Sequence, residues 1–213
     1  MQRLRIRFSR GEEVKYISHL DLMRFWERAL RRARVPLAYS EGFTPHPRIS
    51  LAAPLALGVT SEAELMDITV TRWVTPHWFT SAISQQLPAG IRVLGVYQTA
   101  MVMPSLQSQV RLAEYSVAVA APPSRQEAEA AIDRLLALED LPWSHQRDTG
   151  ERKYNLRALV DDVWITDWTP DQGSLGMRLR CDSGGSGRPE QVSLALGLGL
   201  PKSIHRTKLL LSV

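Results

Sequence analysis

Cysteine is almost absent from this chain, since Cys181 is the only one in 213 residues. A single thiol forms no internal disulfide, and it is too few for an iron–sulfur cluster or a cysteine-rich zinc site. Long apolar runs are absent too, because no stretch approaches the ~18 residues of a membrane-spanning helix. No apolar segment of the kind that signal peptides carry follows the charged start of the chain. We therefore expect a cytoplasmic protein with no membrane partner.

Lysine is also scarce, because only four of the 26 basic residues are lysines: Lys15, Lys153, Lys202 and Lys208. Arginine binds phosphate through a planar fork of donors and stacks on bases, whereas lysine acts as a point charge. The preference for arginine fits a phosphate-binding protein, and it fits a GC-rich genome equally well. Composition alone leaves both explanations open.

The basic residues are concentrated at the start of the chain. Residues 1–50 hold eleven basic and five acidic side chains, a net charge of +6, whereas the remainder carries −2. The basic ones are Arg3, Arg5, Arg7, Arg10, Lys15, Arg24, Arg28, Arg31, Arg32, Arg34 and Arg48. We expect the working surface of the protein to lie in this segment.

The first hundred residues predict the order β-α-β-β-α-β. Leu4, Ile6 and Phe8 alternate with arginines, as in a half-buried strand. Ser18 is a suitable N-cap for an amphipathic helix that ends before Pro36. Further strands are expected at 49–57, 64–71 and 91–99, and a second helix at 76–87. This order resembles a ferredoxin-like domain with a hairpin inserted after its first helix, which we place at residues 1–100.

The second half predicts a related but less regular unit, placed at residues 110–213 beyond a linker at 101–109. Strands are expected at 113–121, around 143–145, and at 163–168, 175–181 and 208–213. Helices are expected at 125–138, near 156–160 and at 189–196. The predicted fold class is therefore α+β, with two tandem ferredoxin-like units and no clear repeat in the sequence.

The first candidate site combines the basic helix with the loop that follows it. The helix carries arginines largely on the face opposite its apolar one: Arg24, Arg28, Arg31 and Arg32. Glu27 is spaced to pair with Arg31, and the loop from Tyr39 to Arg48 adds Phe43. Guanidinium groups bind phosphates and aromatic rings stack on bases, so this set is suited to RNA. A solvated surface helix has the same pattern, and the clustering of charge is what favours a binding function.

Two histidines are candidates for catalysis. His19 and His46 could act as general acid or base near neutral pH, with Tyr39 close to His46 in sequence. Metal-free RNA cleavage needs no more than such groups. Each histidine also has a structural explanation, because His19 falls in the first turn of a helix and His46 lies between two prolines that brace a turn.

Other motifs carry less information. The five histidines show no metal-binding spacing, so we expect no metal and no cofactor. The segment Ser183–Gly187 is glycine-rich, but it lacks the lysine of a P-loop and is better explained as a hairpin turn. Lys153, Arg157 and Arg206 in the second half either extend a phosphate-binding track or pair with nearby carboxylates.

The residues of the basic helix and loop also resemble a known family. The runs YISHLDLMR, ERALRRA, YSEGFTPHPRIS and PLALGV, between Tyr16 and Val59, are similar to the radical-SAM-linked family of uncharacterised bacterial proteins. The likeness weakens beyond about residue 72 and returns at Lys153–Arg157 and His205–Thr207. Where this chain has Asn155, the resemblance leads us to expect aspartate.

The resemblance implies a partner protein for this chain, but it does not imply that the chain catalyses a particular reaction. Members of that family are fused to, or encoded beside, radical-SAM proteins with a cobalamin-binding module, often near ribonuclease E/G genes. This chain has no C-x-x-x-C-x-x-C motif, so it would be the accessory protein and not the radical enzyme.

Three hypotheses follow. The first is an accessory RNA-binding module that presents tRNA or rRNA to a radical-SAM or RNA-processing partner. The second is a metal-independent endoribonuclease that uses His19 or His46. The third is an adaptor that docks a radical-SAM enzyme through its basic surface. The same residues favour binding an RNA over cleaving it, and the sequence leaves open whether the protein has enzymatic activity of its own.

Overall fold

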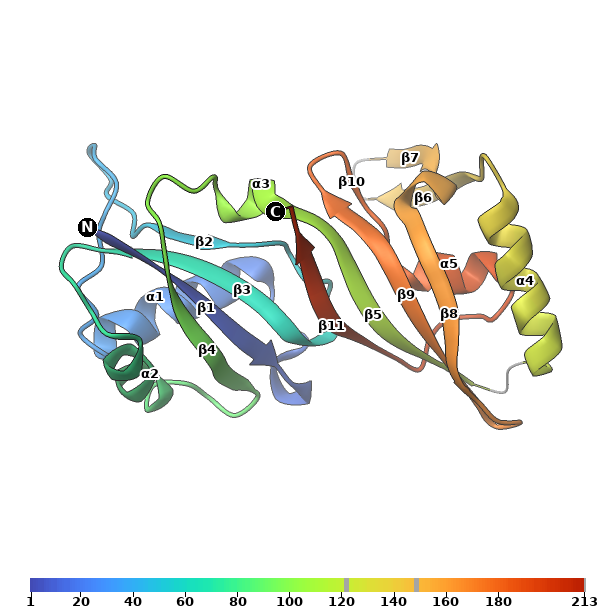
Figure 1. Cartoon of the computed structure of the whole chain (residues 1–213), viewed down its shortest axis with the longest axis horizontal. Helices are drawn as coiled ribbons and strands as arrows, with labels where there is room; N and C mark the ends of the chain where they lie inside the picture. Colours follow the sequence, from blue (N-terminus) through green and yellow to red (C-terminus); the bar gives the residue numbers. More distant parts are fainter. Residues whose placement is uncertain (121–122, 148–149, 213) are drawn as a thin grey trace. The chain divides into compact units, whose positions relative to one another are not determined.

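The computed structural model describes residues 1–120, 123–147 and 150–212 of the chain (Figure 1). These residues form a mixed α+β structure with five α-helices and mostly antiparallel strands. They divide into two compact units: unit 1 comprises Met1–Val110 with the last residues of the chain, and unit 2 comprises Arg111–Leu211. None of the described helices is long and apolar enough to cross a membrane.

Unit 1 contains four main strands and two helices of more than one turn. In chain order its elements are β1 (Gln2–Arg10), the 3-10 turn η1 (Glu12–Val14), α1 (His19–Arg32), β2 (Ile49–Leu51), β3 (Thr60–Val70), α2 (Pro76–Ser84), β4 (Ile91–Thr99) and the short helix α3 (Leu106–Gln109). All pairings within the unit are antiparallel, and they place the strands in the order β4-β1-β3-β2.

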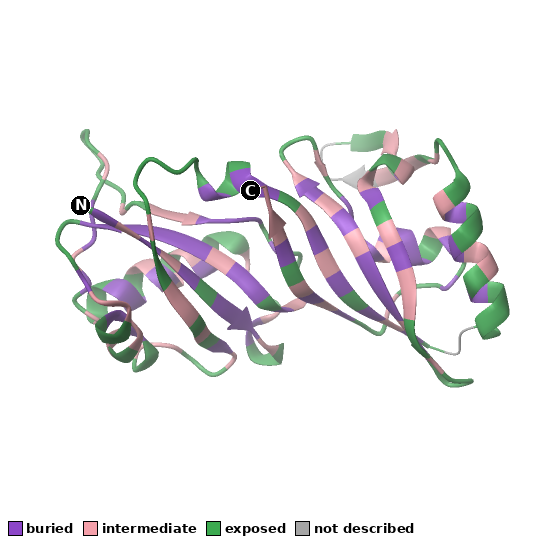
Figure 2. Ribbon diagram, viewed as in Figure 1, coloured by how far each residue is buried: buried purple, intermediate pink, exposed green. Residues whose placement is uncertain are grey.

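Alternation along β1 decides which face of this sheet is buried, as Figure 2 shows. Leu4, Ile6 and Phe8 are fully buried and share one hydrophobic cluster with residues of both α1 and α2. The ring of Phe8 meets Trp26 of α1 edge to face, with centroids 5.0 Å apart. Because both helices pack on the same β1 side chains, both cover the same face of the sheet.

Helix α1 begins and ends with recognisable caps. The hydroxyl of Ser18 accepts a hydrogen bond from the Asp21 amide at 3.1 Å, which confirms the predicted N-cap. At the other end, the amide of Val35 donates to the carbonyl of Leu30 at 3.1 Å, and the Arg34 amide donates to Arg31 at 3.0 Å. This pair of bonds is a Schellman motif, and it ends the helix just before Pro36.

Two predictions for unit 1 need correction. Strand β2 ends at Leu51 and does not continue to residue 57, because Pro54 has no amide to donate to a neighbouring strand. The predicted linker at 101–109 contains α3, whose N-cap Ser105 accepts from the Ser108 amide at 3.3 Å. Its Leu106 is almost fully buried, so this segment packs against unit 1.

Unit 2 is built from seven strands and two α-helices. Its elements are β5 (Val110–Ala120), α4 (Arg125–Ala137), β6 (Pro142–Arg147), β7 (Gly150–Asn155), the 3-10 turn η2 (Arg157–Leu159), β8 (Val160–Trp168), β9 (Gln172–Asp182), β10 (Gly185–Ser186), α5 (Pro189–Ala195) and β11 (Ser203–Leu211). Strand β9 pairs antiparallel with β5, β8 and β10, and β11 is the other neighbour of β5. Strands β6 and β7 pair separately.

The sequence predicted most elements of unit 2, with some differences, among them the short strand β10 inside the predicted hairpin turn. Strand β7 has the charged sequence GERKYN, which has little strand propensity, and it pairs residue by residue with β6. The helix expected near residues 156–160 is the single 3-10 turn η2, and the last strand starts at Ser203, five residues earlier than expected. The predicted strand ends Ala121 and Val213 lie outside the described residues.

Candidate nucleic-acid interface

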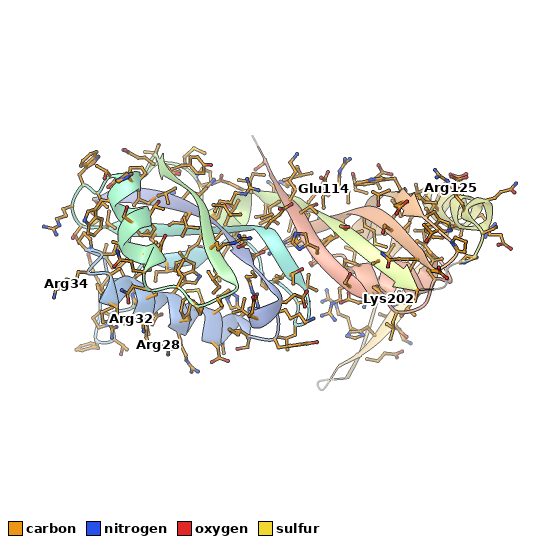
Figure 3. The ribbon with its side chains drawn as sticks, turned by 90° about the horizontal axis from the view of Figure 1, so that it is seen from below. Arg28, Arg32, Arg34, Glu114, Arg125 and Lys202 are labelled. Carbon is orange, nitrogen blue, oxygen red and sulfur yellow. The ribbon has the colours of Figure 1, made fainter. Side chains whose placement is uncertain are left out.

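The exposed face of α1 presents arginines whose charge is largely unopposed. Arg24, Arg28, Arg31 and Arg32 are all exposed, and Figure 3 shows Arg28 and Arg32 on the outer side of the helix. Arg24 lies 3.4 Å from the carboxylate of Asp21, and Arg32 donates to the Gln86 side chain at 3.0 Å. Within the described part of the chain, the side chains of Arg28 and Arg31 form no hydrogen bond or ion pair. The expected pair between Glu27 and Arg31 is therefore not found there.

Arg34 extends this surface from an unusual backbone position. Its φ is +55°, and among the described residues it is the one non-glycine residue with positive φ. Such a left-handed position at a helix end normally holds glycine, and an L-residue there costs about 1 kcal/mol. The Arg34 side chain is exposed, and Figure 3 labels it past Arg32 on the side where α1 ends. A strained position that holds an arginine where glycine is preferred points to a use for its side chain.

The loop after α1, called here the Phe43 loop (Tyr39–Arg48), is held at its base and exposed at its tip. The Arg48 amide donates to the Ala38 carbonyl at 2.8 Å, and the Ser40 amide donates to the His46 carbonyl at 2.8 Å. The hydroxyl of Ser40 accepts from the His46 amide at 3.0 Å. Phe43 at the tip is completely exposed. Its ring is thus open to a ligand.

Several other N-terminal arginines serve the fold, which reduces the predicted basic surface. The guanidinium of Arg5 binds both oxygens of Asp67, at 2.8 and 3.0 Å, and both side chains are mostly buried. Arg10 is buried and donates to the carbonyls of Val14 and Ile17. Arg3 donates to main-chain carbonyls of residues 101 and 103. The charge that remains available to a ligand is concentrated on α1, Arg34 and Arg48.

The two histidines do not form one site. His19 lies two residues after Ile17. The carbonyl of Ile17 accepts a hydrogen bond from Arg10, the last residue of β1, so His19 lies near the end of that strand. The Phe43 loop lies near the other end of β1. The amide of residue 38, just before the loop, donates to the carbonyl of Thr69 in β3. Thr69 is paired with Arg3, which stands at the start of β1. At about 3.3 Å per residue, these two ends of β1 are roughly 23 Å apart.

His46 lies in the same loop as Tyr39, whereas His19 lies near the other end of β1. Tyr39, His46 and Arg48 are exposed residues of the same loop, where residue 39 pairs with Pro47. Within the described residues, no three His, Cys, Asp or Glu side chains are grouped so as to hold a metal ion.

The three basic residues proposed in the second half have different environments. Lys153 is exposed and lies 3.5 Å from Glu151. Arg157 donates to the main-chain carbonyls of residues 136 and 160, so its guanidinium anchors η2. Arg206 is fully buried, so its side chain is not accessible to an RNA ligand and we leave it out of the proposed surface. Asn155 accepts from the amides of residues 141 and 158 through Oδ1, a role that an aspartate could also fill.

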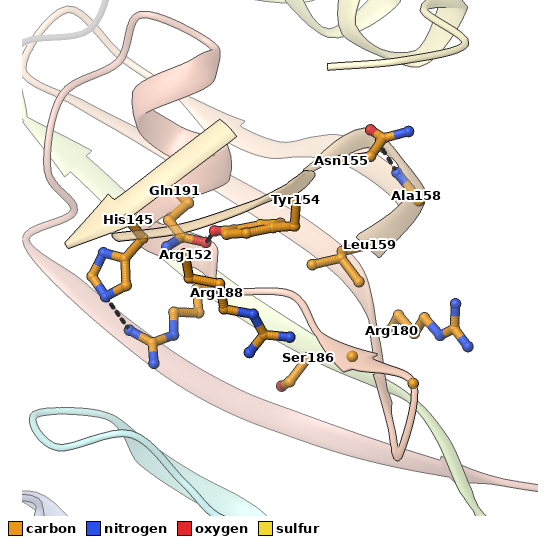
Figure 4. Close-up of a pocket in the computed structure, with 12 residues that line it drawn as sticks. His145, Arg152, Tyr154, Asn155, Ala158, Leu159, Arg180, Ser186, Arg188 and Gln191 are labelled. Carbon is orange, nitrogen blue, oxygen red and sulfur yellow. Dashed lines mark hydrogen bonds between the residues drawn. The ribbon is translucent and has the colours of Figure 1, made fainter. Parts of the chain in front are cut away.

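Unit 2 instead contains a basic pocket that the sequence did not predict. The pocket measures about 220 Å³, and Figure 4 shows its lining. Its cationic side chains are Arg152, Arg180 and Arg188, together with His145. They come from β6, β7, β9 and the start of α5, so no linear motif marks them. The only sequence signal was the glycine-rich segment Ser183–Gly187, which forms β10 and the turn before it.

One of these arginines already has a carboxylate partner. Arg180 donates to both oxygens of Asp182, at 3.0 and 2.9 Å. Burial raises the pKa of Asp182, but the hydrogen bonds from Arg180 and from the amide of Gly184 outweigh burial, so its pKa is below the ordinary value. The charge of Arg180 is thus balanced locally, whereas Arg152 and Arg188 face the pocket without a carboxylate among its lining residues.

Fold and surface together define this chain as a two-unit α+β protein with an arginine-rich helix face. Its sequence matches the family described as "Uncharacterized protein conserved in bacteria (DUF2344)" over residues 3–189, and the chain belongs to that family. A search of curated proteins found no match to the chain.

Two solved structures share the fold at very low sequence identity. One is described as "Crystal Structure of a Cbf5-Nop10-Gar1 Complex", with a TM-score of 0.53 and 9% identity. The other is "Structure of H/ACA RNP bound to a substrate RNA containing 2'-deoxyuridine", with a TM-score of 0.50 and 10% identity. In both cases the match covers 97% of this chain but only 48% and 47% of the other. This chain therefore spans about half the length of the chains that it resembles.

Proposed function

We propose that this protein is an accessory RNA-binding module that presents tRNA or rRNA to a partner enzyme. The observation that carries the proposal is the group of exposed α1 arginines, of which Arg28 and Arg31 are unpaired within the described residues, together with the exposed Phe43 of the loop that follows the helix. Unpaired guanidinium groups bind phosphates and release the counterions of the nucleic acid. The ring of Phe43 provides a face on which an unpaired base can stack.

An ordinary solvated helix accounts less well for this surface. Arginines in the last turn of a helix are favoured by the helix dipole, which explains Arg31 and Arg32 in part. The dipole does not explain Arg34, which lies beyond the helix in a conformation that costs stability. Nor does it explain a fully exposed phenylalanine on the next loop.

The architecture fits the same proposal. We infer that each unit is a ferredoxin-like domain, since unit 1 has the element order β-α-β-β-α-β and the strand order β4-β1-β3-β2. In unit 2 the strand order β11-β5-β9-β8 corresponds to the order β4-β1-β3-β2 of unit 1. The β6–β7 pair is then an insertion in the second domain. One of the fold relatives is part of an RNA–protein complex with a bound substrate RNA, which agrees with an RNA ligand but does not identify one.

The proposal is tested by the affinity of the purified protein for tRNA and for rRNA fragments, measured by fluorescence anisotropy. The test variant combines Arg24→Ala, Arg28→Ala and Arg31→Ala, three exposed changes on α1. A matched control combines Arg92→Ala, Arg134→Ala and Lys208→Ala, which removes the same charge from exposed positions outside α1 and the Phe43 loop. We expect the α1 variant to lose at least tenfold in affinity and the control to lose much less. Equal losses in both variants would show that no specific surface is involved.

A metal-independent endoribonuclease that uses His19 or His46 is the second candidate, and the two histidines would form separate sites. His46, Tyr39 and Arg48 lie together in the Phe43 loop, whereas His19 lies at the other end of unit 1. Incubation of the protein with total RNA at several pH values tests this activity directly. Cleavage that disappears in His19→Ala or in His46→Ala would support it, and intact RNA at every pH would remove it.

A radical-SAM partner is the third element of the proposal, and it rests on the resemblance of the α1 and Phe43-loop residues. Next to the α1 arginines, Tyr16 and Leu20 are apolar and more than two-thirds exposed, which suits contact with a protein. Co-purification of this chain with a radical-SAM protein of the kind that the resemblance implies, after ribonuclease treatment, tests direct docking. Loss of the complex on ribonuclease treatment would show that RNA bridges the two proteins.

A further inference from the structure

We propose that the basic pocket of unit 2 binds a terminal phosphate, either of a nucleotide or of an RNA end. This proposal goes beyond the RNA surface of unit 1, and it does not depend on it, because every lining residue belongs to unit 2. The pocket of about 220 Å³ is smaller than the ~300 Å³ or more of a typical ligand site. Its size suits the phosphate of a nucleotide or of an RNA end, with the remainder of the ligand extending past the wall around Tyr154, and it excludes a longer stretch of RNA.

The charge of the pocket selects an anion. Arg152 and Arg188 line it, and no carboxylate belongs to its lining residues. Arg188 lies 3.3 Å from Nε2 of His145, and Figure 4 shows these two side chains turned toward each other. This contact holds one arm of the Arg188 guanidinium at the pocket. Two guanidinium forks in a partly enclosed pocket match the geometry of a phosphate with several free oxygens.

The glycine-rich turn lets two lining side chains pack closely against it, and its Gly184 amide does not face the anion. The Gly184 amide donates to Asp182 at 2.7 Å, so it is not directed at a ligand. A Cβ at Gly184 would lie 2.5 Å from Nη2 of Arg180, and one at Gly185 would lie 2.7 Å from Leu159. The glycines therefore allow Arg180 and Leu159 to pack against the turn. Recognition of the phosphate falls to side chains, and not to backbone amides as in a P-loop.

One wall of the pocket, around Tyr154, is suited to the part of the ligand that carries the phosphate. The hydroxyl of Tyr154 donates to Oε1 of Gln191 at 2.5 Å, which fixes the position of the ring. The Arg152 guanidinium lies 5.9 Å from the centre of this ring. Ala158 and Leu159 add apolar surface. A cationic end beside a fixed aromatic ring is the combination that binds a nucleoside monophosphate, with the ring beside the base and the arginines at the phosphate.

The test compares ligands that differ only in the phosphate. Isothermal titration of the full chain with AMP, adenosine and inorganic phosphate measures the contribution of each part. We expect AMP to bind at least tenfold more tightly than adenosine. Arg152→Ala and Arg188→Ala should each weaken AMP binding at least fivefold, and Arg134→Ala, an exposed arginine of α4 outside the pocket, should leave it unchanged. Equal affinity for AMP and adenosine, no binding of either, or an equal loss in Arg134→Ala would overturn the proposal.

A second comparison identifies the source of the phosphate and separates this site from the RNA surface of unit 1. A short oligoribonucleotide is titrated with and without a 5′-phosphate. If an RNA end is the ligand, the phosphate should increase affinity in the wild type and in the α1 triple variant, and not in Arg152→Ala. If a free nucleotide is the ligand, AMP should bind more tightly than the phosphorylated oligonucleotide. An α1 triple variant that binds RNA as tightly as the wild type, in a protein whose pocket binds AMP as expected, would disprove only the first proposal.

Discussion

At the scale of single residues, the most informative position is Arg34. The sequence correctly placed the end of α1 before Pro36, but it gave no sign that Arg34 takes a left-handed backbone conformation. Glycine is the usual signal for such a position, and here the residue is an arginine. The buried contacts of Val35 and Leu30 hold the chain in this geometry. Tertiary packing thus overrides the local preference.

Replacing Arg34 by glycine should have opposite effects on the stability of unit 1 and on its affinity for RNA. Arg34→Gly should stabilise unit 1 by about 1 kcal/mol, because the strain of the left-handed position is removed. The same change should weaken RNA binding, because it removes an exposed guanidinium. Urea unfolding and anisotropy titration measure the two effects. A variant that is more stable and binds RNA as well as the wild type would show that Arg34 has no part in the interface.

The carboxylate of Asp182 predicts how unit 2 responds to acid. Its pKa is lower in the folded state, because Arg180 and the Gly184 amide hydrogen-bond to the ionised form more strongly than burial opposes it. A lowered pKa adds stability above the unfolded pKa, and that stability is lost as the pH falls through the folded pKa. Asp182→Asn keeps an acceptor for the Gly184 amide but cannot ionise. We therefore expect the variant to lose less stability than the wild type when thermal unfolding is followed from about pH 5 to about pH 3.

At the scale of elements, the sequence predicted those that carry a strong local pattern. Helix α1 has a capping serine, an apolar face at helical spacing and a proline just beyond its end, and it forms as expected. Strand β7 and the short strand β10 have no such pattern, because their sequences are charged or glycine-rich. These two strands form because a neighbouring strand supplies partners for their backbone hydrogen bonds. The local pattern of one segment does not show which other segment it will pair with, so the sequence could not predict them.

The Phe43 loop is the element whose role is easiest to isolate. Phe43 makes no buried contact, so Phe43→Ala should change the free energy of unfolding by less than about 0.5 kcal/mol. If the ring stacks on a base, the same change should weaken RNA binding by about 1–3 kcal/mol. Phe43→Tyr keeps an aromatic face and should retain most of the affinity. Equal binding by the alanine variant and the wild type would remove the loop from the interface.

At the scale of the whole molecule, the charge distribution was readable from the sequence but its use was not. The net charge of +6 in residues 1–50 pointed to unit 1 as the binding unit. The guanidinium of Arg5, however, is paired with Asp67, and that of Arg10 is hydrogen-bonded to main-chain carbonyls. The pocket of unit 2 was not predicted at all. Its arginines are separated by up to 36 positions in the chain, from Arg152 to Arg188, and only the pairing of strands brings them together.

The central claim is that the arginines of α1 bind the phosphates of an RNA. The measurement that tests it most directly is the salt dependence of RNA affinity for the wild type and for the variant with Arg24, Arg28 and Arg31 changed to alanine. Each lost phosphate contact should reduce the slope of log K against log salt concentration by about 0.7–0.9. We therefore predict a slope lower by about 2 in the triple variant, with weaker binding at every salt concentration. The same slope and the same affinity in both proteins would contradict the account.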